Sequence, residues 1–178
     1  AYGVCGIYSA PGTAVKEAYD TSGIVTNDRG VTVWLKGNRV SRNQIMAIKE
    51  ESVTEQKNSL AVCLDNILRH AGITRNTEYD LAQGKTATTI LSENMTGVQV
   101  LDLSGCTLDA VLYYVNQDIP VLAILEDGEA VLVTGFNEFN VVIMEPSTGK
   151  LYKKGMNDAT AWFAENGNHF ITYMRTEN

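Results

Sequence analysis

The stretch IPVLAILEDGEAVLVTGFNEFNVVIMEPSTG, residues 119–149, decides the fold. Polar or glycine-containing turns separate its three apolar segments, which are residues 119–125, 130–134 and 141–144. Short apolar runs bounded by turn residues are typical of buried strands, and Pro146 cannot continue a strand ladder. We therefore expect three consecutive strands at the centre of an antiparallel sheet, with Gly135 ending the second strand.

The clearest helix precedes this sheet and covers residues 59–72. Its apolar residues recur at the spacing of one helical face, namely Leu60, Cys63, Leu64, Ile67, Leu68 and Ala71. Asn58 or Ser59 can cap its first turn, and Gly72 ends it. The pattern predicts a helix that packs its apolar stripe against the sheet.

The remaining segments supply further helices and strands. Thr77, Thr107 and Asn157 are residue types that cap helices. The predicted helices are one or two short ones within residues 77–95, one starting after Thr107 and one from Asn157 to Glu165. The predicted strands are residues 98–103, 150–153 and 168–174. This mixture of helices with an antiparallel sheet predicts the α+β class.

The first 48 residues read as a small separate unit. Residues 2–8 can form a strand, residues 13–20 a helix, and residues 24–26 and 31–35 a hairpin. Tyr19 and Trp34 are the expected anchors of its core. Such a short piece has little core of its own, so we expect this strand–helix–strand–strand unit, residues 1–48, to dock on the main domain, residues 52–178.

Composition excludes several classes of function. The chain has 178 residues, 44% of them hydrophobic, and a formal net charge of −7. A negative charge of this size disfavours binding to nucleic acid. No apolar run reaches the roughly 18 residues that a membrane span needs, so we expect no membrane insertion. No signal-peptide pattern is visible, and the chain begins with Ala1, as a trimmed or mature chain would.

Cysteine and histidine are scarce. The three cysteines, Cys5, Cys63 and Cys106, form no CxxC pair, and the two histidines are His70 and His169. This spacing predicts free thiols rather than a disulfide framework. It also argues against a zinc site, and we expect no metal and no cofactor.

The positions of proline and glycine in the central stretch resemble those of a known family. Residues 120–121 read Pro-Val, residues 128–136 read Gly-Glu-Ala-Val-Leu-Val-Thr-Gly-Phe, and residues 145–149 read Glu-Pro-Ser-Thr-Gly. This frame resembles papain-like cysteine peptidases of the bacteriocin-processing, double-glycine type. That family reads Pro-Val, then Gly-His-Ala-Val-x-Val-x-Gly-Tyr, then Asp-Pro-x-x-Gly. The resemblance covers residues 52–178 and implies a papain-like fold, a central helix packed on an antiparallel sheet.

The resemblance also assigns positions to the catalytic residues of the family. Glu129 stands where the family has its catalytic His, and Glu145 where it has the Asp that orients that His. Aligning the glycine that ends the central helix with Gly72 places the nucleophile position at Ser59. Gln56 could correspond to the oxyanion-hole Gln, although it lies closer to the nucleophile position than is usual. The chain therefore resembles a degenerate member of the family.

Each candidate residue also has a structural interpretation. Ser59 can simply be a helix cap, and Cys63, within the apolar stripe, can be a buried hydrophobe. His70 lies two helical turns after Cys63, roughly 10 Å away, which is too far for a hydrogen-bonded dyad. His169 falls in the last strand, outside the position of the family's His, which favours a structural role.

Three functional hypotheses follow. The first is a non-catalytic peptide-binding or structural module of a larger bacterial surface or secreted protein, as the resemblance implies. The second is an active cysteine peptidase with a rearranged set, Cys63 with His169. The third is a paired-carboxylate cation site at Glu129 and Glu145, should they face each other across adjacent strands; alternatively, each is a strand-end residue. Ligand and oligomeric state stay open.

Overall fold

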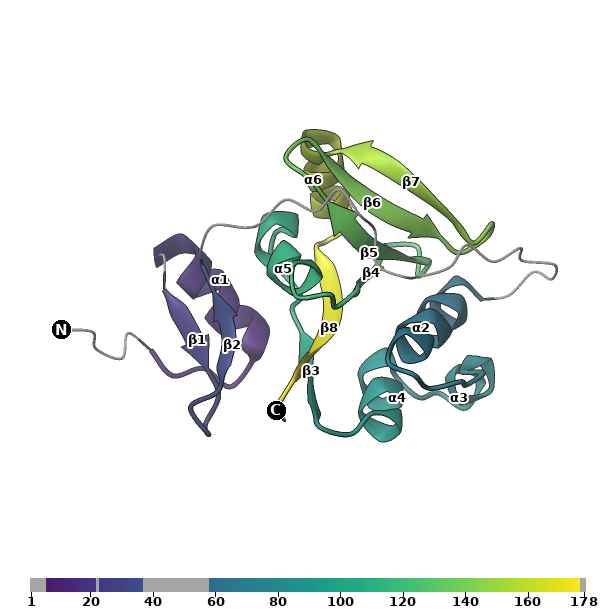
Figure 1. The fold of residues 1–178 in the computed structure, drawn as a ribbon, viewed down its shortest axis with the longest axis horizontal. Coiled ribbons are helices and arrows are strands. Elements are labelled where there is room, and N and C mark those ends of the chain that lie inside the picture. The colour runs from purple at the N-terminus through teal and green to yellow at the C-terminus, as the bar shows by residue number, and fades with distance from the viewer. Residues whose placement is uncertain (1–5, 22, 37–57, 177–178) are drawn as a thin grey trace.

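A computed structural model of the chain describes residues 6–21, 23–36 and 58–176 (Figure 1). The helices are α1 (Pro11–Thr21), α2 (Ser59–His70), α3 (Glu78–Ala82), α4 (Ala87–Asn94), α5 (Leu108–Val115) and α6 (Met156–Glu165). The strands are β1 (Ile24–Thr26), β2 (Thr32–Leu35), β3 (Val98–Asp102), β4 (Val121–Ile124), β5 (Ala130–Phe136), β6 (Asn140–Glu145), β7 (Lys150–Gly155) and β8 (His169–Arg175). Cys5 and Gln56 lie outside the described residues.

The main sheet has six strands in the order β3-β8-β4-β5-β6-β7, and every neighbouring pair is antiparallel. The three strands expected from the central stretch are β4, β5 and β6, which lie next to one another. The last strand of the chain, β8, inserts between β3 and β4. The predicted α+β class and the central antiparallel sheet are confirmed.

Helices cover the two sides of this sheet. Every residue of β5 is buried, which requires apolar cover on both faces. Helix α2 packs on β4 and β5 and also contacts α4, whereas α5 packs on β4, β5 and β8 and contacts α6. Figure 1 shows α2, α3 and α4 on one side of the sheet, with α5 on the other. None of the helices in the described part of the chain has the length and apolar character needed to span a bilayer.

Strand β5 is longer than the sequence predicts. It continues through Gly135 to Phe136 and pairs with β6 across a register irregularity between Val133 and Gly135. Gly135 was expected to end the strand, but a glycine within a strand also marks a β-bulge. The prediction was wrong because a single glycine signals both a strand end and a bulge.

One predicted helix cap is wrong, and another is right in position but makes no capping bond. Helix α6 begins at Met156, with Gly155 as its cap residue and no side-chain capping bond, so Asn157 lies inside the helix. Thr77 is the N-cap residue of α3 as expected, but its side chain makes no capping bond there. Thr107 caps α5 as expected, since its hydroxyl accepts from the Ala110 N–H at 3.4 Å.

The N-terminal unit docks on α5. The Trp34 indole N–H donates to the Ala110 carbonyl at 3.0 Å, and the Tyr114 hydroxyl donates to the Val33 carbonyl at 2.8 Å. Tyr19 donates to Asp109 at 2.9 Å. The predicted helix and hairpin are present as α1, β1 and β2, but residues 6–8 of the predicted first strand are not in a strand. We call residues 6–36 the N-terminal unit below.

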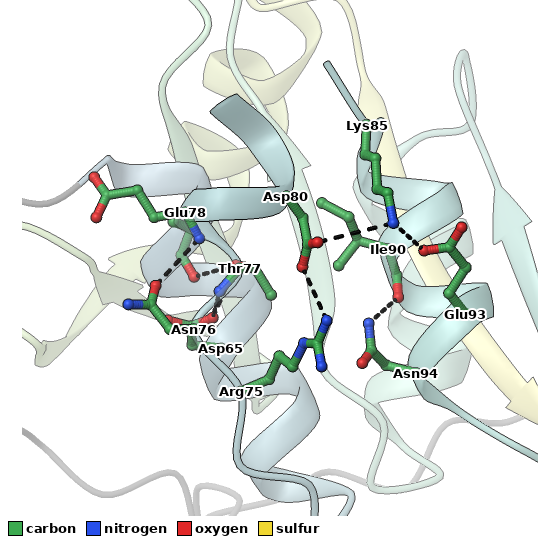
Figure 2. A network of polar contacts seen from close by, with 11 residues as sticks. Asp65, Arg75, Asn76, Thr77, Glu78, Asp80, Lys85, Ile90, Glu93 and Asn94 are labelled. Carbon is green, nitrogen blue, oxygen red and sulfur yellow. Dashed lines mark hydrogen bonds and ion pairs between the residues drawn. The ribbon is translucent and has the colours of Figure 1, made fainter. Parts of the chain in front are cut away.

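A polar network joins α2, α3 and α4 (Figure 2). Thr77 is fully buried, and both its N–H and its hydroxyl donate to Asp65 Oδ1 at 2.8 Å. Asp80, whose side chain is also largely buried, lies 3.7 Å from Arg75 and 3.8 Å from Lys85. Asp65 on α2 therefore holds the segment that leads into α3, where Thr77 was expected to cap a helix.

Lys85 links this network to α4. Its ammonium lies 2.7 Å from the Glu93 carboxylate, and this hydrogen bond raises the pKa of Lys85. The pair is exposed, with half of the Glu93 side chain in solvent (49%). Exposed pairs contribute little to stability, so the Lys85–Glu93 pair is a suitable comparison for the buried Asp65–Thr77 contact.

Replacing Asp65 by alanine should destabilise the fold by about 1–3 kcal/mol, because it leaves the buried Thr77 N–H without its acceptor and leaves the hydroxyl only the Ala61 carbonyl at 3.2 Å. Asp65→Asn retains an acceptor oxygen and should cost less. Glu93→Ala is the matched control and should change stability by less than about 0.5 kcal/mol. Urea unfolding measures all three variants; equal effects of Asp65→Ala and Glu93→Ala would contradict this assignment.

Candidate functional site

The candidate site begins at the head of α2. Asn58 is the cap residue, and its side-chain oxygen accepts from the N–H groups of Leu60 at 2.9 Å and Ala61 at 3.3 Å. Ser59 is therefore the first residue of the helix rather than its cap. Capping by Asn58 leaves the hydroxyl of Ser59 available for a contact outside the helix.

That contact is with the first residue of β5. The Ser59 hydroxyl oxygen accepts the backbone N–H of Ala130 at 3.0 Å. The Leu125 N–H donates to the Glu129 carbonyl at 2.7 Å, which makes these two residues a bonded pair of the β4–β5 hairpin. Antiparallel strands alternate bonded and non-bonded pairs, so the Ala130 N–H points away from β4, toward β6.

Strand β6 supplies no acceptor at that point. It ends at Glu145, and Pro146 follows it into a turn closed by the Gly149 N–H donating to the Glu145 carbonyl at 2.8 Å. The Ser59 hydroxyl takes the place of a β6 carbonyl. Sequence reasoning missed Ala130, and the early end of β6 at Pro146 was the signal that could have indicated an unpaired N–H there.

Glu129 lies beside this bond, but its carboxylate is not part of it. Glu129 is exposed, and its backbone N–H donates to Asp127 at 2.9 Å. Consecutive strand residues point to opposite faces, so its side chain diverges from that of Ala130. In the part of the chain that the structure describes, no hydrogen bond joins the Glu129 carboxylate to Ser59.

Glu145 is held within its own turn. Its carboxylate accepts from the N–H of Ser147 at 3.3 Å and from the hydroxyl of Ser147 at 3.1 Å. Leu132 pairs with Met144, so the register places residue 131 opposite Glu145, and Glu129 lies two positions further along. Glu129 and Glu145 are therefore not opposite each other across adjacent strands.

The described side chains do not form a metal site of three or more ligands either. Among residues 6–21, 23–36 and 58–176, no group of three or more His, Cys, Asp or Glu side chains is placed to hold a metal ion. The Glu145 carboxylate instead accepts hydrogen bonds within its own turn, and Glu129 is exposed. This arrangement favours the strand-end interpretation of Glu129 and Glu145.

Cys63 is part of the hydrophobic core. It is fully buried, and burial, followed by the nearby Glu145 carboxylate, raises the pKa of its thiol well above the ordinary value. Cys106 is also buried and free, and burial raises its pKa to about 11. A thiolate is the nucleophilic form of cysteine, so the core position of Cys63 opposes its proposed role as a nucleophile.

Neither histidine lies beside Ser59. His70 is at the opposite end of α2, about 16 Å along the helix axis from Ser59, and its Nε2 lies 3.0 Å from the Asp118 carbonyl oxygen. His70 therefore fastens the C-terminal end of α2 to the turn between α5 and β4.

His169 occupies the first position of β8. It pairs with Ile124 on β4, which in turn pairs with Ala130 on β5. Two strand spacings separate His169 from Ala130, about 10 Å. Since the Ala130 N–H points away from β4, Ser59 lies on the far side of Ala130 from His169, which rules out a direct Ser59–His169 hydrogen bond.

We expect the thiols of Cys63 and Cys106 to resist alkylation in the native protein. A thiol with a pKa of about 11 is thiolate in only about one molecule in a thousand at pH 8, and burial also blocks access. Iodoacetamide treatment followed by peptide mass mapping should label neither residue. Unfolding without reductant should make all three cysteines reactive; a protected cysteine would reveal a disulfide.

Comparison with known proteins supports the fold. No family model matches the chain, and no curated protein matches its sequence. A crystal structure from Bacillus anthracis, provisionally described as a C39-like peptidase, superposes with a TM-score of 0.61 at 12% sequence identity. The match covers 77% of this chain and 100% of that chain. At this identity the likeness shows the fold alone: an α+β, papain-like fold of the C39-like peptidase type.

Proposed function

We propose that the chain is a non-catalytic C39-like domain that serves as a peptide-binding or structural module. The observation that carries this proposal is the bond between the Ser59 hydroxyl and the Ala130 N–H. Ser59 occupies the position that the family resemblance assigns to the nucleophile. Its oxygen serves there as a structural acceptor that joins the head of α2 to the start of β5.

The chemistry of the aligned positions supports the absence of catalysis. A papain-like peptidase needs a nucleophile whose proton is taken by a neighbouring imidazole, which later protonates the leaving amine. The aligned positions carry Ser59, Glu129 and Glu145. None of these side chains is an imidazole, the usual proton-transfer group near pH 7, and neither described histidine reaches Ser59.

The binding role is proposed from the family resemblance. The bond fixes α2 against β5, which are the two elements between which that family holds an extended peptide. A peptide in this position would meet Ser59 and Glu129 and would gain affinity from main-chain hydrogen bonds. By the same resemblance, we propose that the chain belongs to a larger bacterial surface or secreted protein, with peptide or protein as its partner.

The proposed function predicts binding without hydrolysis. Incubation of the purified chain with an unstructured peptide library should give no cleavage by mass spectrometry, and Cys63→Ala should change nothing. The same library should shift backbone amide resonances near Ser59 and Glu129. Cleavage that Cys63→Ala or Ser59→Ala abolishes would show an enzyme; resonance shifts elsewhere, or none, would argue against the binding role.

Ser59 variants separate its structural role from a chemical one. Ser59→Ala should destabilise the fold by about 1–2 kcal/mol, because the Ala130 N–H loses its acceptor. Thermal and urea unfolding measure this loss, and Ser147→Ala, in an exposed turn, is the matched control, with an expected change below about 0.5 kcal/mol. An unchanged stability for Ser59→Ala would contradict the structural role.

A further inference from the structure

The two edges of the main sheet are protected in different ways. Strand β7 forms one edge and carries Lys150, Lys153 and Lys154. Lysines on an edge strand oppose pairing with another chain. Strand β3 forms the other edge and reads Val-Gln-Val-Leu-Asp, with no lysine and no proline. Its sequence offers no such protection.

The outer edge of β3 presents backbone groups in a regular pattern, and no backbone partner among residues 6–21, 23–36 and 58–176 pairs with them. The Thr176 N–H donates to the Gly97 carbonyl at 2.9 Å, and the Leu103 N–H donates to the Phe170 carbonyl at 2.8 Å. Residues 97 and 103 therefore belong to bonded pairs with the β8 side. Because bonded pairs alternate along an antiparallel ladder, the backbone groups of Val98, Val100 and Asp102 point outward, away from β8.

The N-terminal unit packs against the Asp102 end of this outer edge. A Cβ atom at Gly12, in the first turn of α1, would lie 3.1 Å from the carbonyl oxygens of both Asp102 and Ser104, so only glycine fits this close approach without a shift. On the same side, the Asn27 side chain donates to Gln99 at 3.2 Å. Figure 1 shows the N-terminal unit beside α5, on the β3 side of the sheet.

Without the N-terminal unit, the outer edge of β3 can pair with the same edge of a second copy of the chain. An antiparallel β3–β3 pair centred on Val100 places Val98 opposite Asp102 and Val100 opposite Val100 of the other copy. These are the residues whose backbone groups point outward, so every pair in this register can be a bonded pair. Asp102 meets a valine rather than another carboxylate, which avoids like-charge repulsion. The resulting interface is two-fold symmetric and therefore closes as a dimer.

We propose that the N-terminal unit prevents the β3 edge from pairing with another strand. When it is docked on α5, it blocks β3 and keeps the chain monomeric. When it is displaced, β3 pairs with β3 of a second copy of the chain. The unit therefore acts as a switch between a monomer and a strand-paired dimer, on the side of the fold that the proposed peptide site does not use.

Gly12→Val tests this proposal in the full chain, because the added side chain crowds the carbonyls of Asp102 and Ser104 and forces a shift at this contact. Trp34 is 2% exposed, so its displacement should shift the fluorescence emission to longer wavelength. Val33→Asp, which places a charge at a buried position of β2, is a second displacing variant. Gly23→Ala is the control, since a Cβ there makes only ordinary contacts at 3.5–3.6 Å.

Sedimentation measures the outcome. Both displacing variants should have about twice the mass of the wild-type chain and of Gly23→Ala. Adding Val100→Pro should restore the monomer, because it removes an outward N–H without breaking a bond to β8; Val98→Pro, at the first strand residue, is the alternative if Val100→Pro does not fold.

Three results would overturn the proposal. The first is a chain that stays monomeric although the Trp34 emission has shifted. The second is a dimer that persists with proline in β3. The third is an unshifted Trp34 emission in both displacing variants, which would mean that the unit does not leave the edge even when its contacts are broken.

Discussion

The structure depends on the burial of β5 along its whole length. A strand buried on both faces cannot lie at the surface of a sheet with one wet side, so the chain must supply apolar cover twice. Helix α2 covers one face and α5 the other. Helix α5 in turn buries Tyr114 and meets Trp34 of the N-terminal unit. The need to bury both faces of β5 thus determines where α2 and α5 lie.

The candidate site is a consequence of where the strands around β5 end. Pro146 stops β6 before it reaches the level of Ala130, and the N–H of Ala130 would be left unpaired there. An unpaired N–H in a partly buried place costs free energy comparable to a lost hydrogen bond. Ser59 supplies the missing acceptor because Asn58 already caps the helix. The contact between α2 and β5 therefore satisfies a backbone N–H that would otherwise lack an acceptor.

The sequence predicted the elements of the main sheet and the central helix because their signals are local: apolar runs, turn residues and the stripe of α2. It failed at Gly135 and Asn157, where one residue type is compatible with two local structures and tertiary contacts choose between them. Thr77 lies at the predicted cap position, but its hydroxyl donates to Asp65 on another helix, a partner that no local pattern can reveal.

The position of Ser59 followed from a resemblance, but its bond did not. That bond depends on the β5–β6 register and on the end of β6, both of which are set by pairing between distant residues. The same limit explains the carboxylates. Glu129 and Glu145 were expected to face each other only if the register allowed it, and the pairing of Leu132 with Met144 places them two positions apart.

The identity of the residue at position 59 is itself informative. A hydroxyl oxygen is a good acceptor for a backbone N–H, whereas a thiol sulfur is a weak one. A catalytic cysteine at this point would pair poorly with the Ala130 N–H but would gain from the positive end of the helix dipole as a thiolate. Serine reverses both properties, since it accepts well and ionises poorly. Its presence is what a junction between α2 and β5 requires, and it is the opposite of what thiol catalysis requires.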